Sequence, residues 1–144
     1  MEKIEKIRLM IKEPGKPARV EEVDHTIEKM QEIVGGRIDC AQMPGTDDID
    51  IFFDDEGLNY EKPANVWLAG SDNCIMGTIY FVGYKARTGE SVSLTDKQIK
   101  QCEKYIENFA IPDCFNIYSP DYYLISQIMN SKSKKYLQGS FEEM

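Results

Sequence analysis

The spacing of apolar residues in the first third of the chain predicts a β-hairpin followed by a helix. Apolar and polar residues alternate over 6–12, as in a half-buried strand. A proline–glycine turn leads into a second strand over 17–23, so these two strands form a hairpin. Apolar residues three and four apart over 27–34 predict a helix, which Gly35 and Gly36 stop.

The middle of the chain predicts three more strands, over 37–43, 48–54 and 74–84. The last of them is rich in β-branched and aromatic residues, and Gly77 inside it indicates a bulge or a close backbone approach. The segment 58–72 is irregular, and we expect a loop there. Alternation along the strand over 48–54 directs three carboxylates to solvent: Asp48, Asp50 and Asp54.

The last third of the chain predicts two helices. Thr95 and Gln98 have the spacing of a capping box, at the start of an amphipathic helix that ends before Pro112. A serine–proline pair at 119–120 begins a second helix, and the chain from Ser131 onward is expected to be solvated. The element order β-β-α-β-β-β-α-α predicts an α+β domain. We expect an antiparallel sheet of about five strands, with two or three helices covering one face.

Composition and length favour a single domain over 1–144. The chain is 42% hydrophobic and 29% charged, and it is long enough to bury a core. No apolar run approaches the roughly 20 residues that span a bilayer. The first residues lack the apolar core of a signal peptide, so we expect a cytoplasmic protein without a membrane partner.

Neither a metal site nor a cofactor is predicted. The chain has four cysteines, without C-x-x-C spacing, and one histidine, so the ligands of a zinc site are not available. The cysteines are expected to be reduced and buried: Cys40, Cys74, Cys102 and Cys114. The glycine spacings fit neither a phosphate-binding loop nor a dinucleotide fingerprint.

Negative charge is concentrated in one segment. The net charge of the chain is −8, and residues 44–73 carry eight acidic residues against one basic residue, Lys62. Phosphate contacts need a basic face, so direct binding to nucleic acid is not expected. A partner with a basic surface fits better, and the candidate partner-binding residues are Asp47, Asp48, Asp50, Asp54, Asp55 and Glu56.

Two other interpretations of the acidic segment stay open. One is a divalent cation site, although the spacing of a calcium loop would place the apolar Phe52 at its first ligand position. The other is a solvated strand face whose charge protects a sheet edge from aggregation.

Two further groups of residues have both a functional and a structural interpretation. The tyrosines near the last helix would form a subunit contact in a homo-oligomer or pack that helix onto the sheet: Tyr118, Tyr122 and Tyr123. His25 beside Asp24 has the residue types of a general base. No nucleophile motif lies near it in sequence, so we expect capping or packing there and predict no catalytic residue.

Four segments in this order resemble the domain of unknown function 3846 family: EPGKP with VEEVDHTIEKMQEIVGGRID, DDEGLNYEKPAN, IMGTIYFVG and SVSLTDKQI. The resemblance covers roughly residues 6–109, and residues 110–144 form a C-terminal helical extension. It implies a small accessory protein of phages, plasmids and integrative elements, and it implies no catalytic residues. The chain departs from the family in the more acidic loop over 47–50 and in the extension, where a function of its own is expected.

Together these observations predict a non-enzymatic mobile-element protein. We expect it to bind and inhibit a host factor, such as a defence system, through its acidic surface. The alternative is a protein that sequesters a small, cyclic nucleotide signal in a pocket with aromatic and basic contacts. By residue type, Lys85, Arg87 and the tyrosines are the candidates for those contacts.

Overall fold

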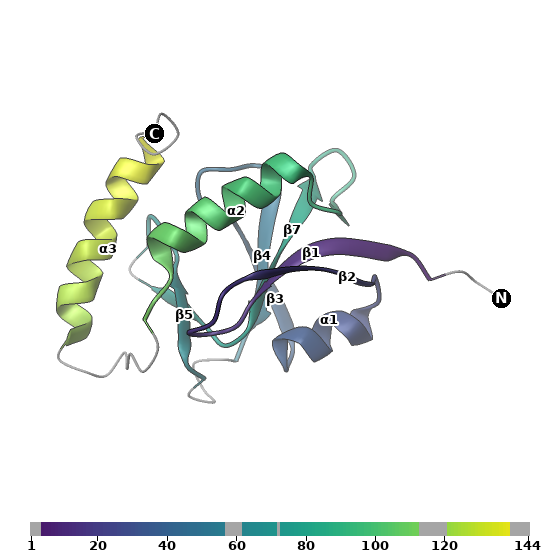
Figure 1. Ribbon diagram of the computed structural model, residues 1–144, viewed down its shortest axis with the longest axis horizontal. Helices are drawn as coiled ribbons and strands as arrows, with labels where there is room; N and C mark the ends of the chain where they lie inside the picture. Colours follow the sequence, from purple (N-terminus) through teal and green to yellow (C-terminus); the bar gives the residue numbers. More distant parts are fainter. Residues whose placement is uncertain (1–3, 57–61, 72, 113–120, 139–144) are drawn as a thin grey trace.

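The computed structural model describes residues 4–56, 62–71, 73–112 and 121–138. These residues form eight strands and three helices, so the predicted α+β class is confirmed (Figure 1). The strands are β1 (Lys6–Lys12), β2 (Arg19–Asp24), β3 (Ile38–Gln42), β4 (Ile49–Asp54), β5 (Ala64–Trp67), β6 (Cys74–Met76), β7 (Ile79–Lys85) and β8 (Glu90–Val92). The helices are α1 (Ile27–Val34), α2 (Asp96–Phe109) and α3 (Asp121–Leu137).

The main sheet is antiparallel throughout, in the order β2-β1-β7-β4-β3. Strand β8 pairs with the far end of β7, and β5 and β6 form a separate two-stranded sheet. The register aligns Met10, Phe81 and Ile51 in one row across β1, β7 and β4. The next row contains Tyr80 and Phe52, whose side chains point to the opposite face.

Helices cover both faces of the sheet, whereas the sequence predicted helices on one face. Met10, Ile51 and Phe81 belong to a large core that includes the inward face of α2, and Tyr80 and Val82 belong to a smaller core with α1. Figure 1 shows α2 and α1 on opposite sides of the strands. The continuous apolar runs of the central strands reflect this burial on both faces.

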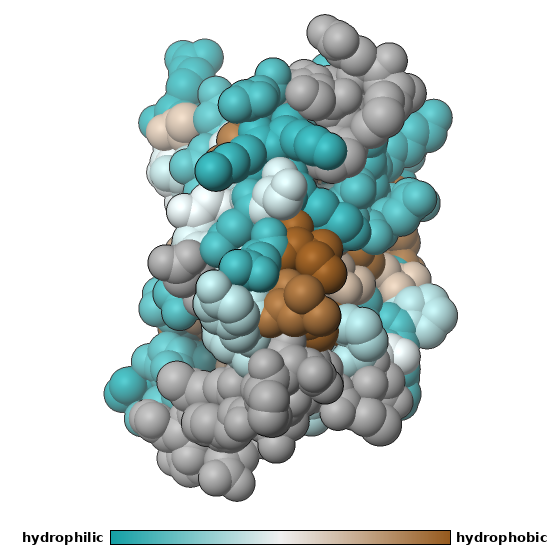
Figure 2. All heavy atoms as spheres, turned by 90° about the vertical axis from the view of Figure 1, so that its left-hand side faces the viewer, coloured by the Kyte–Doolittle hydropathy of each residue, from teal (hydrophilic) through white to brown (hydrophobic). Residues whose placement is uncertain are grey.

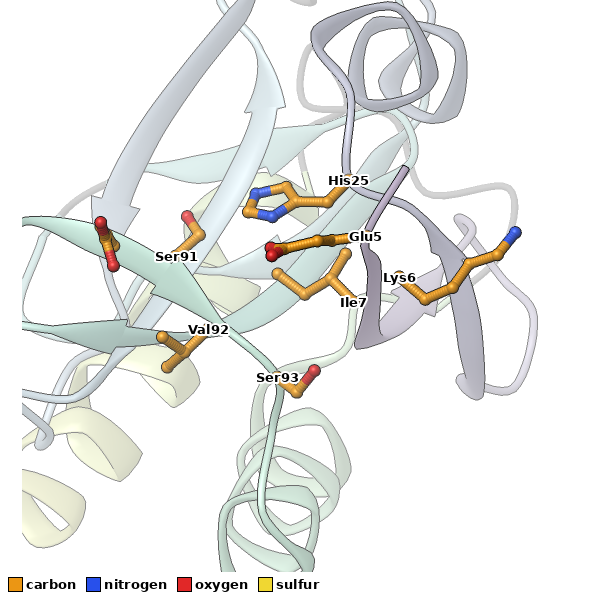
Figure 3. A pocket seen from close by; sticks show the side chains of 8 residues that line it. Glu5, Lys6, Ile7, His25, Ser91, Val92 and Ser93 are labelled. Atoms are coloured by element: carbon orange, nitrogen blue, oxygen red, sulfur yellow. The ribbon is translucent and has the colours of Figure 1, made fainter. Parts of the chain in front are cut away.

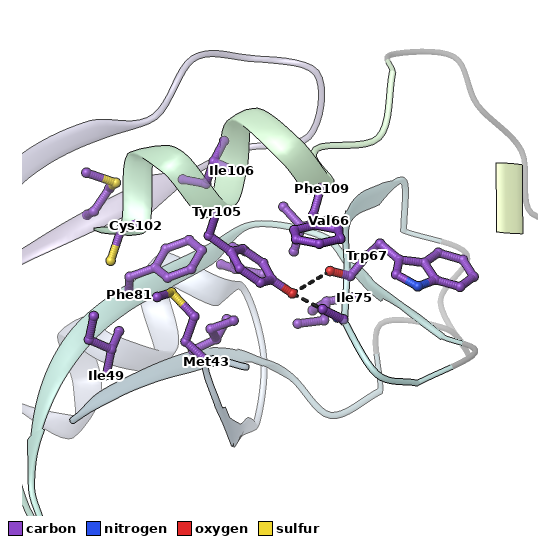
Figure 4. Close-up of a cluster of buried hydrophobic side chains, with 14 of the residues drawn as sticks. Met43, Ile49, Val66, Trp67, Ile75, Phe81, Cys102, Tyr105, Ile106 and Phe109 are labelled. Atoms are coloured by element: carbon purple, nitrogen blue, oxygen red, sulfur yellow. Dashed lines mark hydrogen bonds between the residues drawn. The ribbon is translucent and has the colours of Figure 1, made fainter. Parts of the chain in front are cut away.

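The larger core surrounds a buried tyrosine. Tyr105 of α2 donates a hydrogen bond to the carbonyl of Trp67 (2.7 Å) and accepts one from the Ala69 N–H (3.0 Å) (Figure 4). Its ring also packs on Phe81 and Phe109. One side chain thereby fixes the β5–β6 sheet beneath α2, and burial raises its pKa.

Two predicted element boundaries are wrong for physical reasons. The strand expected over 74–84 breaks at Gly77, which has a φ of 78° that a β-strand does not allow. Part of the expected loop over 58–72 is strand β5, which pairs with β6. The buried Asn65 amide holds it in place by donating hydrogen bonds to the carbonyls of Lys12 and Gly77, both 2.8 Å. These contacts are long-range, so local sequence does not reveal them.

Helix α3 continues beyond Ser131, where a solvated chain was expected. Ser133 is buried, and its hydroxyl donates to the carbonyl of Met129 at 2.7 Å. The Tyr136 ring packs edge-on against Tyr105 and Phe109. Tertiary packing therefore stabilises the C-terminal half of α3, although the helix is only weakly amphipathic. None of the described helices is long and apolar enough to cross a membrane.

Candidate functional site

Strand β4 divides the predicted acidic surface into two groups. Asp47 and Asp48 lie in the turn before β4, and Asp54, Asp55 and Glu56 lie at its far end. Strands rise about 3.3 Å per residue, so β4 holds the two groups roughly 20 Å apart. The acidic residues therefore form two separate sites on the molecule.

Asp54 is buried, which corrects the prediction that it faces solvent. Its side chain is 2% exposed, and its Oδ2 lies 2.6 Å from Lys62 Nζ. The same ammonium donates to the carbonyls of Val34 and Gly35 at the end of α1, at 3.1 and 3.2 Å. Asp54 faces inward because α1 closes this end of the sheet, so its carboxylate is part of the fold.

The ion pair sets the charge state of Asp54. Burial raises the pKa of this carboxyl, but the hydrogen bonds from Lys62 and the Glu56 N–H and the charges of Lys62 and Arg37 outweigh it. The net result is a pKa below the ordinary value. Asp54 is thus ionised at neutral pH and has its charge compensated inside the protein.

Asp55 and Glu56 are also paired. Arg37 Nε donates to Asp55 Oδ2 at 2.8 Å, and Arg37 Nη2 lies 3.7 Å from Glu56 Oε1. The guanidinium is 72% exposed, so these pairs are solvated and contribute little to stability. They nevertheless neutralise part of the charge at this end of β4.

Asp47 and Asp48 are exposed, and neither forms an ion pair with a described residue. The turn that carries them is held firmly. The carbonyl of Asp48 accepts hydrogen bonds from the Tyr84 N–H (2.8 Å) and from Gln98 Nε2 (3.0 Å). We call residues 44–48 the acidic turn. It presents two carboxylates from a fixed backbone.

Asp50 belongs with the acidic turn in sequence but has a different environment. It lies on β4 opposite Gln42 and Val82, half-buried on the face that α1 covers. Burial raises the pKa of its carboxyl. The exposed charge that a partner would meet first is therefore that of Asp47 and Asp48.

His25 lies in a cleft that sequence analysis did not find. Asp24, its neighbour, forms an ion pair with Lys6. Glu5, just before β1, instead extends its carboxylate toward His25, and Ser91 of β8 lines the same cleft (Figure 3). Serine, histidine and glutamate are the residue types of a hydrolase triad, yet no hydrogen bond joins these three side chains in the described part of the chain.

Comparison with models of known protein families identifies one family. A family model described as domain of unknown function (DUF3846) matches residues 7–110. The chain belongs to this family. No curated protein matches it, and no solved structure does.

Three of the four segments that carried the resemblance to DUF3846 meet around the buried ion pair. A Cβ atom on Gly36 would lie 2.6 Å from the Asp54 carboxylate, and one on Gly77 would lie 2.8 Å from Lys62 Cδ. These glycines, Asp54 and Lys62 come from three different segments. Those segments therefore encode a structural site in this chain.

Helix α3 lies beyond the DUF3846 match, and it places two of the tyrosines predicted for a subunit contact in different environments. Tyr122 is half-buried with its ring 6.0 Å from that of Trp67, whereas Tyr123 is 70% exposed. Tyr118 lies outside the described residues. Leu124 and Ile128 are also exposed on α3, and an apolar patch is visible on this side of the molecule (Figure 2). A subunit contact at this patch stays a prediction.

The remaining candidate residues have no common site. Lys85 ends β7 and Arg87 lies in the turn before β8, and neither lines the cleft at His25. Cys102 is buried, with a pKa raised to about 12 by burial and by Asp48 and Glu103, but Cys40 is exposed on the edge strand β3. Among the described residues no group of three or more histidine, cysteine or carboxylate side chains could hold a metal ion.

We predict that Asp54→Asn lowers the free energy of unfolding at pH 7 by about 3 kcal/mol, because it leaves the largely buried Lys62 ammonium without a countercharge. Because the pKa of Asp54 is lower in the native protein than the unfolded value of about 3.9, its ionised form stabilises the fold above that pH. This stabilisation is lost as the pH falls through the native pKa. The difference in free energy of unfolding between the natural protein and Asp54→Asn should therefore narrow below about pH 4. Urea unfolding across pH measures it.

The matched control is Asp55→Asn, which removes an exposed ion pair at the same end of β4. It should cost less than about 1 kcal/mol. Equal losses in the two variants would contradict a structural role that is particular to Asp54.

Proposed function

We propose that this protein acts by binding, as an accessory protein of a phage or another mobile element that inhibits a factor of its bacterial host. The proposed contact is the acidic turn, with Asp47 and Asp48 as the exposed charges. A partner that normally binds nucleic acid, such as a nuclease of a defence system, carries a basic groove that this turn would enter. Opposite charges speed such an encounter and select against wrong partners.

The contact between α3 and the acidic turn is the observation that carries the proposal. Tyr136 Oη donates to the carbonyl of Pro44 at 2.6 Å. A Cβ atom on Gly45 would lie 2.8 Å from the Tyr136 ring, so the turn and the helix touch. The sequence indicated two departures from the family pattern, the loop over 47–50 and the C-terminal extension. The acidic turn includes the first two residues of that loop, and the extension contacts the turn just before them, at Pro44 and Gly45.

The anchoring also supports binding on energetic grounds. A loop that must become ordered on association loses affinity through the entropy of ordering. The acidic turn is tied to β7 through Tyr84, to α2 through Gln98 and to α3 through Tyr136. The backbone that carries its carboxylates is therefore preorganised, and a basic partner would lose little entropy in ordering that backbone.

We predict that the double reversal Asp47→Lys/Asp48→Lys abolishes capture of the partner and leaves the fold intact, since both side chains are exposed. The measurement is a pull-down with tagged protein from lysate of a bacterial host, with captured proteins and small molecules identified by mass spectrometry. The control is Glu28→Lys/Glu32→Lys on the exposed side of α1, which changes the net charge by the same amount.

Retained capture by the Asp47→Lys/Asp48→Lys variant would contradict the proposal. So would an eluate that contains an unchanged nucleotide and no protein partner. That second result would instead support the alternative, sequestration of a small nucleotide signal.

A second prediction concerns the support of the turn. Tyr136→Phe removes the hydrogen bond to Pro44 but keeps the packing on Tyr105 and Phe109. We expect faster amide hydrogen exchange at Thr46 and Asp47 and a severalfold loss of affinity for the captured partner, with the unfolding midpoint changed little. Unchanged affinity together with faster exchange would show that a preorganised turn is not needed.

A further inference from the structure

We propose that the cleft between β1, β8 and the start of α1 binds a small amphipathic molecule with a protonated amine at one end. We call this space the split-sheet cleft. It is lined by Glu5, Lys6, Ile7, His25 and residues 90–93. The acidic turn is not part of it, so this inference does not rest on the proposed function.

The cleft arises from the topology of the sheet. Strand β1 pairs with β7 over Met10–Lys12, whereas β8 pairs with β7 at its other end, over residues 83–85. The first half of β1 diverges from β7, and Arg8 joins it to the chain after β8 through hydrogen bonds with Ser93 (2.9 Å) and Leu94 (3.0 Å). A cavity of about 560 Å³ remains beside this junction.

The outer part of the cleft has the polar groups for an ammonium. The Glu5 carboxylate extends to the His25 ring in Figure 3, and Ser91 lines the same cleft from β8. A carboxylate and a hydroxyl oxygen accept hydrogen bonds from an ammonium, and the bond to the carboxylate is charge-assisted.

The same charges disfavour an anionic ligand. Lys6 lines the cleft, but its ammonium is paired with Asp24 and its side chain points away from Glu5 in Figure 3. Glu90 adds a second carboxylate to the lining. A phosphate or carboxylate ligand would therefore meet two acidic residues and a lysine whose charge is already compensated, whereas an amine would meet complementary charge.

The inner part of the cleft has the surface for an apolar body. A second cavity of about 250 Å³ shares Ile7, His25 and Ser91 with the first. Its floor includes Phe52 and Tyr80, whose rings stack at 4.9 Å with an interplanar angle of 3°. Apolar surface buried there contributes about 25 cal/mol per Å². The two cavities together accept a ligand that is polar at one end and apolar at the other.

The test uses three probes of similar size: 2-phenylethylamine, 2-phenylethanol and 3-phenylpropionate. Binding to the full chain is followed by amide chemical shifts in two-dimensional NMR. We expect the amine to bind about tenfold more tightly than the alcohol, the effect of roughly one charged hydrogen bond. The carboxylate should bind more weakly than both. Shifts should concentrate at Ile7, His25 and Ser91, and ethylamine, which lacks the apolar body, should bind far more weakly.

Glu5→Gln should remove the preference for the amine over the alcohol and leave alcohol binding unchanged. Glu5 is exposed, so this variant should fold normally. The control Glu22→Gln removes the same charge from β2, outside the cleft lining, and should keep the preference. The proposal is overturned if the amine does not bind at millimolar concentration or binds no better than the carboxylate. An equal effect of Glu5→Gln and Glu22→Gln would overturn it as well.

Discussion

The buried ion pair between Asp54 and Lys62 holds together parts of the chain that are far apart in sequence. It joins the end of β4 to the segment before β5, and through the carbonyls of Val34 and Gly35 it joins both to the end of α1. Burying two charges costs several kcal/mol, and the ammonium meets that cost with three oxygen partners. This contact fixes the end of α1 beside β4, and the smaller apolar core holds the rest of the helix on the sheet.

The ion pair also decides which acidic residues are left for binding. Asp54 is paired with Lys62, and the single charge of Arg37 is shared between Asp55 and Glu56, so the described residues at the far end of β4 keep one uncompensated negative charge. Asp47 and Asp48, which have no ion-pair partner among the described residues, lie at the other end in the acidic turn, which α3 supports from outside the DUF3846 match. The segments around the ion pair thus build the scaffold, and the acidic turn lies at the other end of β4, in contact with α3.

The sequence predicted most of the elements correctly because their signals are local. The Thr95–Gln98 capping box and the apolar spacing of α1 need no information about the rest of the chain. The burial of Asp54 was not predictable in this way, because the alternation along β4 indicates a face and not what covers it. The cleft at His25 was missed for the same reason, since Glu5 and Ser91 are brought together only by the divergence of β1 from β7. One available signal was the continuous apolar run in β7, which is typical of a strand covered on both faces.

The most direct test of this account is the titration of the aspartate carboxyl groups by carbon-detected NMR, in the natural protein and in Lys62→Met. We predict that the Asp54 carboxyl titrates with a pKa below its ordinary value and that Lys62→Met raises that pKa. A pKa of Asp54 at or above the ordinary value, unchanged by Lys62→Met, would contradict it. Asp54 would then not be held as a charge by Lys62, and the division of the acidic segment into a structural and a binding half would be wrong.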